Sequence, residues 1–138
     1  MAAQASTEHP NVGVVTSMLD AYDAGDLEGM LDSFGDDAIF HVGGDNIISG
    51  DYRGRQAIRD GLVRVARLTG NTLKMEVDEI LAGDRHAVLF MRVTTERNGR
   101  RIDTEASEAF RIDGNGRIAE TWFMHADQAA YDAFYAEE

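Results

Sequence analysis

The sequence predicts a single α+β domain over residues 1–138, with helices first and then a strongly curved antiparallel sheet. Two observations predict this order. Apolar residues recur at helical spacing in the first half of the chain, and from Asn71 onward they alternate with polar residues at the period of a strand. The chain has no internal repeat or linker, and 138 residues is a common domain length. We expect residues 1–8, which are polar, to form a flexible tail.

The first helix is predicted by four residues at i, i+3, i+4 and i+7, namely Val15, Met18, Leu19 and Tyr22. Pro10 suits its first turn, and Gly25 suits its end. Asp26 is then placed to cap a second, short helix. The same spacing recurs in that helix at Leu27, Met30, Leu31 and Phe34.

The segment between this helix pair and the sheet predicts a strand, a loop and a third helix. Residues 38–42 predict a short strand, and the glycine-rich residues 43–54 predict a loop. Residues 55–68 predict a helix with Ile58, Leu62 and Val65 on one side.

The strands of the sheet are predicted together with their register. Asn98-Gly99 is a strong signal for a two-residue hairpin loop, which pairs Arg97 with Arg100 and places Leu89 opposite Glu108. A loop at Gly83-Asp84 places Ile80 opposite Ala87, and one extra residue near Asp78-Glu79, a β-bulge, then keeps the apolar face continuous. A loop at Gly114-Asn115 places Glu108 opposite Thr121. A last helix follows Asp127, with Tyr131, Phe134 and Tyr135 on one side.

Glu108 and His125 are the two ionisable residues that this register places on the apolar face of the sheet. Burial of a carboxylate disfavours its charged form, so Glu108 is a candidate general acid or hydrogen-bond donor. His125 is a candidate base. The alternatives are a Glu108 that reaches solvent or pairs with an arginine, and a His125 bonded to backbone. The register separates the two by about 13 Å along the strand, so they would contact opposite ends of one ligand.

The remaining polar signals predict structure more readily than chemistry. His41 alternates with Phe40 and Val42, so we expect it to face outward. The histidine spacings fit no metal site, the sequence has no cysteine, and we predict neither metal nor cofactor. Trp122 lies on the outer face of the last strand, which favours a homodimer interface, with cover by the last helix as the alternative.

The charge balance excludes whole classes of partner. The formal net charge is −12, which opposes binding to nucleic acid or to an anionic membrane surface. No apolar run reaches membrane-spanning length and no secretory signal is present, so we predict a cytoplasmic protein. Five arginines crowd residues 53–67, and a solvated helix face explains them better than an anion site.

Three segments resemble the nuclear transport factor 2-like superfamily, especially its SnoaL-like and ketosteroid-isomerase-like members. They are residues 22–40, YDAGDLEGMLDSFGDDAIF, residues 50–58, GDYRGRQAI, and residues 110–118, FRIDGNGRI. The resemblance implies a cone-shaped fold in which the helices close a pocket formed by a strongly bent sheet. It also implies that dimers are common.

The resemblance does not supply a complete catalytic site. Ketosteroid isomerases carry a catalytic aspartate, an oxyanion tyrosine and a neutral acid, and the matching positions here are Val42, Met18 and Glu108. The aspartate of SnoaL-like cyclases matches Phe123 or a neighbour, and the sites of limonene-epoxide hydrolases and scytalone dehydratases are also incomplete.

Two functions therefore stay open. One is an enzyme that isomerises, cyclises or dehydrates a small, mostly apolar metabolite by acid–base chemistry without a cofactor. The other is a non-catalytic ligand-binding or structural module. For the first, Glu108 and His125 are the predicted catalytic pair. The predicted ligand-binding residues are Met18, Tyr22, Phe40, Val42, Leu89, Met91, Thr121 and Phe123.

Overall fold

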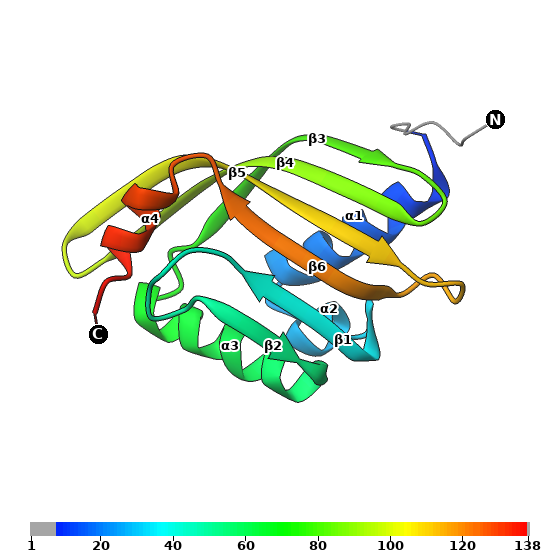
Figure 1. The fold of residues 1–138 in the computed structure, drawn as a ribbon, viewed down its shortest axis with the longest axis horizontal. Helices are drawn as coiled ribbons and strands as arrows, with labels where there is room; N and C mark the ends of the chain where they lie inside the picture. Colours follow the sequence, from blue (N-terminus) through cyan, green and yellow to red (C-terminus); the bar gives the residue numbers. More distant parts are fainter. Residues whose placement is uncertain (1–7, 138) are drawn as a thin grey trace.

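The computed structural model describes residues 8–137, so the predicted tail lies almost entirely outside the described residues. Figure 1 shows the order of elements along the chain. They are α1 (Pro10–Asp23), α2 (Leu27–Leu31), β1 (Phe34–Val42), β2 (Gly50–Arg53), α3 (Gly54–Thr69), β3 (Lys74–Ala82), β4 (His86–Arg97), β5 (Arg100–Ile112), β6 (Ile118–His125) and α4 (Gln128–Phe134).

The helices begin and end close to where the sequence predicts. Pro10 occupies the first turn of α1, and Gly25 follows its end with a positive φ of 73°. The side chain of Asp26 accepts a hydrogen bond of 2.9 Å from the backbone N–H of Gly29, so it caps α2 as predicted. Phe34 does not extend α2 but begins β1, where it is fully buried.

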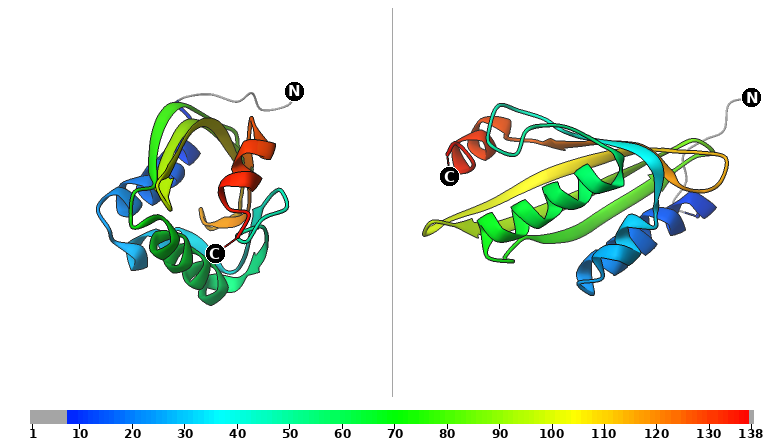
Figure 2. Two further views of the ribbon diagram at one scale, coloured as in Figure 1. Left: turned by 90° about the vertical axis from the view of Figure 1, so that its left-hand side faces the viewer. Right: turned by 90° about the horizontal axis from the view of Figure 1, so that it is seen from below.

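The six strands form one curved, mixed sheet in the order β2-β1-β6-β5-β4-β3. Strands β1 and β6 run parallel, and the other neighbours are antiparallel. Figure 2 shows the sheet strongly curved, with α1, α2 and α3 along its concave side and α4 at one end. The cone-shaped α+β fold is therefore confirmed.

Part of the predicted register is also confirmed. Strands β4 and β5 pair Arg97 with Arg100 and Leu89 with Glu108, as the Asn98-Gly99 hairpin predicts. The register between β3 and β4 shifts between Val77 and Glu79, where we predict a bulge. The apolar stripe does not continue evenly through this bulge, because Val77 is 45% exposed.

Two loops differ from the prediction, and the register beside each of them differs by two residues. Asp113 and Arg117, rather than Asp113 and Gly116, close the loop between β5 and β6, and the Asp113 carboxylate accepts bonds from the N–H groups of Asn115 and Arg117. This loop is one residue longer than predicted and the register shifts once more between Arg111 and Ile112, so Glu108 lies opposite Phe123, not Thr121. The loop between β3 and β4 keeps its predicted length but lies one residue later, because Gly83 bonds to His86, so Ile80 pairs with Leu89. A shift of two keeps every side chain on its predicted face.

The prediction of a loop over residues 43–54 is wrong in its second half. Gly50–Arg53 forms the edge strand β2, which pairs with residues 39–42 of β1. Strand β1 also begins four residues earlier than predicted. A four-residue strand bounded by two glycines lacks an alternating pattern long enough to be recognised, and its structure comes from pairing with β1.

The main core lies between the concave face of the sheet and helices α1, α2 and α3. It includes Val15, Phe34, Leu89, Val93 and Phe110, each 0% exposed. A smaller cluster of Ile48, Tyr131, Phe134 and Tyr135 packs α4 against the loop before β2. Because α4 packs there, it leaves Met124 on the outer face of β6 48% exposed, so the alternative that the last helix covers this face is wrong.

Candidate functional site

A cavity of about 90 Å³ lies inside the cone, between the concave face of the sheet and the helices. Its walls are mainly apolar, and the ionisable side chains among its lining residues are Tyr22, Tyr52, Glu108, His125 and Tyr131. An apolar pocket with a few convergent polar groups is the usual form of a small-molecule site.

Glu108 lies at the centre of β5 and is 3% exposed. Burial raises the pKa of its carboxyl group to about 7, although a hydrogen bond of 2.5 Å from the Thr121 hydroxyl opposes the shift. The partner of Glu108 among residues 8–137 is thus a neutral hydroxyl and not an arginine. At neutral pH a substantial fraction of this carboxyl group carries a proton that it can donate.

His125 ends β6 and is 9% exposed. Neither ring nitrogen has a hydrogen-bond partner among the described residues, so the predicted alternative of a histidine bonded to backbone does not hold. Burial lowers the pKa of the imidazole to about 4, although the charge of Asp132 opposes the shift. The ring is therefore neutral near pH 7, with one nitrogen able to accept a proton or hydrogen bond.

Glu108 and His125 are closer along the sheet than the predicted register placed them. Glu108 lies opposite Phe123 and His125 lies opposite Ala106, so the two residues are offset by two positions on the same face. Two positions correspond to about 7 Å along the strand. They do not bond to one another, but both line the one cavity.

The predicted ligand-binding residues fall into two groups. Met18, Tyr22, Phe40, Val42 and Phe123 line the cavity together with Glu108 and His125. The other three do not: Leu89, Met91 and Thr121 are at most 1% exposed and pack behind the cavity wall. Strand parity places these three on the concave face correctly, but it cannot say which residues the helices cover.

A family model described as the SnoaL-like domain matches residues 15–121, which is most of the chain and includes Glu108. The protein belongs to the SnoaL-like family. A search of curated proteins finds no significant match.

Several solved structures, an NTF2-like protein from Burkholderia pseudomallei among them, share the fold of this SnoaL-like chain. Bal32a from a soil-derived mobile gene cassette is 29% identical, with a TM-score of 0.87 over 94% of this chain and 99% of that one. TerC, co-crystallised with polyporic acid, is 15% identical, with a TM-score of 0.81 over 92% and 98%. RV0760c from Mycobacterium tuberculosis, in complex with estradiol-17beta-hemisuccinate, is 16% identical, with a TM-score of 0.74 over 88% and 98%.

Tyr131 of α4 also lines the cavity of this SnoaL-like domain, a position that the sequence does not predict. Its ring stacks on that of His125, with centroids 3.4 Å apart, and it is 3% exposed. Arg97 holds this helix by donating a hydrogen bond of 2.9 Å to the carbonyl of Phe134. The helical pattern predicted an apolar side for α4 but contained no signal for the element against which that side packs.

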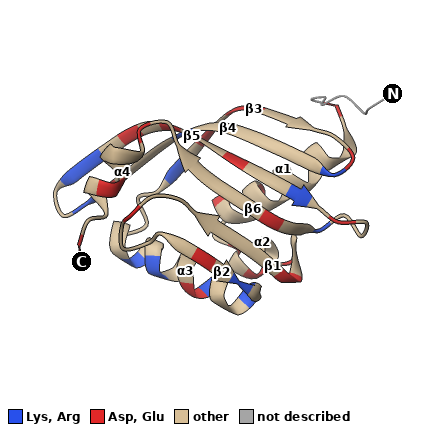
Figure 3. Ribbon diagram, viewed as in Figure 1, with Lys and Arg blue, Asp and Glu red and all other residues tan. Residues whose placement is uncertain are grey.

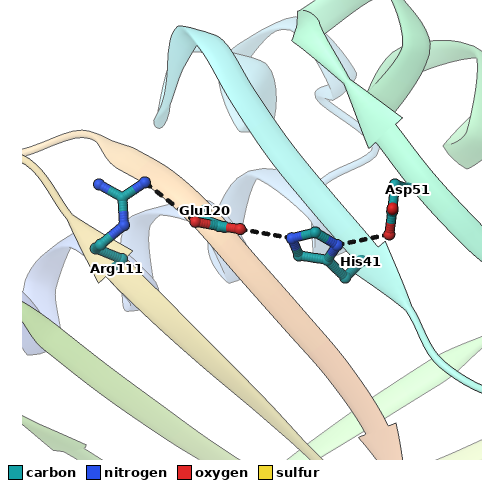
Figure 4. Close-up of polar contacts among 4 residues, drawn as sticks. All are labelled: His41, Asp51, Arg111 and Glu120. Atoms are coloured by element: carbon teal, nitrogen blue, oxygen red, sulfur yellow. Dashed lines mark hydrogen bonds and ion pairs between the residues drawn. The ribbon is translucent and has the colours of Figure 1, made fainter.

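A second ionisable cluster lies outside the cavity, on the outer face of the sheet (Figure 4). The two ring nitrogens of His41 lie 2.6 Å from Asp51 and 2.6 Å from Glu120, and Glu120 also accepts a bond of 3.2 Å from Arg111. Although partial burial opposes it, the bonds to Asp51 and Glu120 raise the pKa of His41. This outward position agrees with the predicted strand alternation.

Figure 3 shows the basic residues concentrated on α3 and at the tip of the β4–β5 hairpin. The α3 arginines tie this helix to the rest of the SnoaL-like domain. Arg55 donates to the carbonyl of Phe34, Arg59 pairs with Glu28, and Arg64 donates to the carbonyl of Ile47. Over residues 8–137 no group of acidic, histidine and cysteine side chains is arranged to hold a metal. No helix in the same range is long and apolar enough to cross a bilayer.

Proposed function

We propose that this SnoaL-like domain binds a small, mostly apolar metabolite and acts on it by acid–base chemistry without a cofactor. Isomerisation, cyclisation and dehydration are the reaction types that this chemistry serves. The observation that carries the proposal is the placement of two buried ionisable groups, Glu108 and His125, on the wall of one apolar cavity.

Glu108 is the proposed acid. Its pKa of about 7 is matched to neutral conditions, so it can give a proton to an oxygen of the ligand or hold that oxygen by a hydrogen bond. His125 is the proposed base, since its neutral ring has no protein partner that would compete for its accepting nitrogen. Met18, Tyr22, Phe40, Val42 and Phe123 are the proposed ligand contacts.

A binding module without catalysis is the second candidate. It is favoured by the hydrogen bond from Thr121, which satisfies one oxygen of Glu108 from within the protein. Buried carboxyl groups are tolerated when they are hydrogen-bonded, so the Glu108 side chain can be structural. The ligand complexes of TerC and RV0760c are compatible with both candidates.

The test begins with thermal stabilisation by polyporic acid, estradiol-17β-hemisuccinate and a panel of apolar metabolites. Each hit is then incubated with wild type, Glu108→Gln, His125→Gln and Glu105→Gln. Glu105 lies on the same strand but is exposed, so its variant is the matched control. Loss of about a hundredfold or more in turnover with Glu108→Gln and His125→Gln supports an enzyme. Turnover that survives in both variants excludes the proposed chemistry.

We further propose that the domain forms a homodimer through the outer face of its sheet. Phe90 and Met124 are 43% and 48% exposed. Phe90 on β4 and Met124 on β6 both pair with Ser107 on β5, so they lie on either side of Ser107. Half-buried Trp122 lies in the next row, where its ring stacks on His41 at 5.6 Å. Light scattering should give twice the monomer mass for wild type and the monomer mass for a Phe90→Lys/Met124→Lys double variant.

A further inference from the structure

The inner cavity does not hold a whole metabolite of ordinary size. Its volume of about 90 Å³ is well below the 300 Å³ or so at which ligand sites for drug-sized molecules begin. A ligand that reaches Glu108 and His125 must therefore either be very small or extend out of the cavity.

A groove of about 900 Å³ adjoins the cavity on the side bordered by α1, α2, α3 and β3. The two spaces share part of their walls, since both are lined by Tyr22, Met30, Leu62, Val65, Leu73 and Met75. Figure 2 shows these helices and β3 grouped on one side of the fold. The shared residues place the groove directly beside the cavity.

The groove changes in character from its inner to its outer part. Its shared wall is apolar except for Tyr22, whose pKa is raised to about 12 by burial and by the charge of Asp23, so its hydroxyl stays a hydrogen-bond donor. Val63, also in the groove, is 49% exposed and adds apolar surface to its outer part. Lys74 and Glu76 bring charges of both signs to the groove.

We propose that cavity and groove form one two-part site, and that its ligand is an elongated amphipathic molecule. A compact head enters the cavity and meets Glu108 and His125. An apolar stem follows along the groove, and a polar end reaches the charged residues in the groove. This inference rests on the proposed function for the role of the head, and it adds the length and polarity of the ligand.

Linear 1-alkanols from butanol to decanol test the site, with displacement of N-phenyl-1-naphthylamine fluorescence as the readout. If the groove takes the stem, the dissociation constant falls by up to about fourfold with each added methylene group through decanol. Ala66 lines the groove but not the cavity, so Ala66→Trp should leave butanol unchanged and weaken decanol at least tenfold. Ala130→Trp on the exposed side of α4 is the matched control.

A second measurement needs no variant. Lys74 is the sole lysine of the chain, so acetic anhydride modifies this side chain and the terminal amine, which serves as the internal reference. Bound decanol should slow acetylation of Lys74 relative to the terminal amine, and bound butanol should not. This result also supports the proposal if Ala66→Trp does not fold.

The proposal is overturned if no alkanol displaces the dye, if affinity stops rising at chains short enough for the cavity alone, or if decanol leaves the acetylation of Lys74 unchanged. None of these measurements involves turnover. A negative result here therefore excludes the groove from the site, while the roles of Glu108 and His125 are still tested separately by the turnover of their own variants. Loss of those roles, in turn, leaves the chain-length dependence intact.

Discussion

The hydroxyl of Thr121, behind the cavity wall, donates a hydrogen bond of 2.5 Å to the carboxyl group of Glu108, which lines the cavity, and both side chains are buried. The bond joins neighbouring strands on a diagonal, because Thr121 itself lies opposite Phe110. It holds a carboxyl group in place without supplying a positive charge. Glu108 therefore stays close to the balance point between its neutral and charged forms.

Glu108→Gln should change how stability depends on pH. The folded pKa of about 7 is above the ordinary 4.5, so the folded state binds the proton more tightly and wild type loses stability as pH rises from about 4.5 to about 7. The full loss is on the order of 3 kcal/mol. Glutamine keeps the acceptor for Thr121 and removes this dependence, so the variant should be more stable than wild type at pH 8. Urea unfolding of both proteins across pH 4–8 measures this pH dependence of stability. Parallel profiles for wild type and Glu108→Gln would contradict the prediction.

His125→Phe should stabilise the fold. The two ring nitrogens are buried without partners, which costs free energy that a phenyl ring would not incur. Phenylalanine also keeps the aromatic stack on Tyr131. We expect the free energy of unfolding at pH 7 to rise by about 1 kcal/mol.

The difference in stability between His125→Phe and wild type should grow at acidic pH. The folded pKa of about 4 is below the ordinary 6.5, so wild type loses stability as pH falls from about 6.5 toward 4, while the variant loses none of this contribution. A proton NMR titration of the His125 ring in wild type is the direct check. A ring that titrates near 6.5 would show that it is not buried as described.

Glu120→Gln should lower the pKa of His41. Because both ring nitrogens face carboxylate oxygens at 2.6 Å, both must carry a proton, and removing one carboxylate weakens the preference for the imidazolium. The stability that this cluster contributes is fully present below pH 6.5 and is lost as pH rises through the raised pKa. NMR titration of His41 in wild type, Glu120→Gln and Asp51→Asn measures the shift, and an unchanged value in both variants would exclude the bonds of Figure 4.

Tyr131→Ala should both destabilise the protein and enlarge its cavity. The tyrosine ring is 3% exposed, and truncating a buried aromatic residue costs about 3 kcal/mol or more. The conservative Tyr131→Phe keeps the ring on His125 and should lose far less. Thermal unfolding compares the two, and binding of N-phenyl-1-naphthylamine should tighten only in Tyr131→Ala if the ring fills space that a ligand can use.

Local chemistry made most of the fold predictable. Residues close together in the sequence determine three features that lie where the sequence predicts them. These are helix α1 with its apolar residues at i, i+3, i+4 and i+7, the Asp26 cap and the Asn98-Gly99 hairpin. Glu108 and His125 were found for the same reason, since strand parity survives a register error of two residues.

The rest depends on contacts between distant segments. Strand β2 forms because it pairs with β1. The loop after Asp113 is longer than its sequence pattern predicts, because the Asp113 side chain accepts a hydrogen bond within it. Leu89 and Met91 share the face of Glu108, yet they pack in the core instead of lining the cavity. No pattern within one strand reveals such packing, and the same holds for Tyr131 over His125.

The strand order has a consequence for how the chain is made. Strand β6 lies between β1 and β5, so the last strand to leave a ribosome is the one that joins β1 and β2 to β3, β4 and β5. Until it arrives, β1 exposes an unpaired edge and the nascent chain has no complete sheet. The native sheet can therefore form only after β6 has been synthesised, and a chain truncated before residue 118 should be degraded or aggregate rather than persist as a smaller domain.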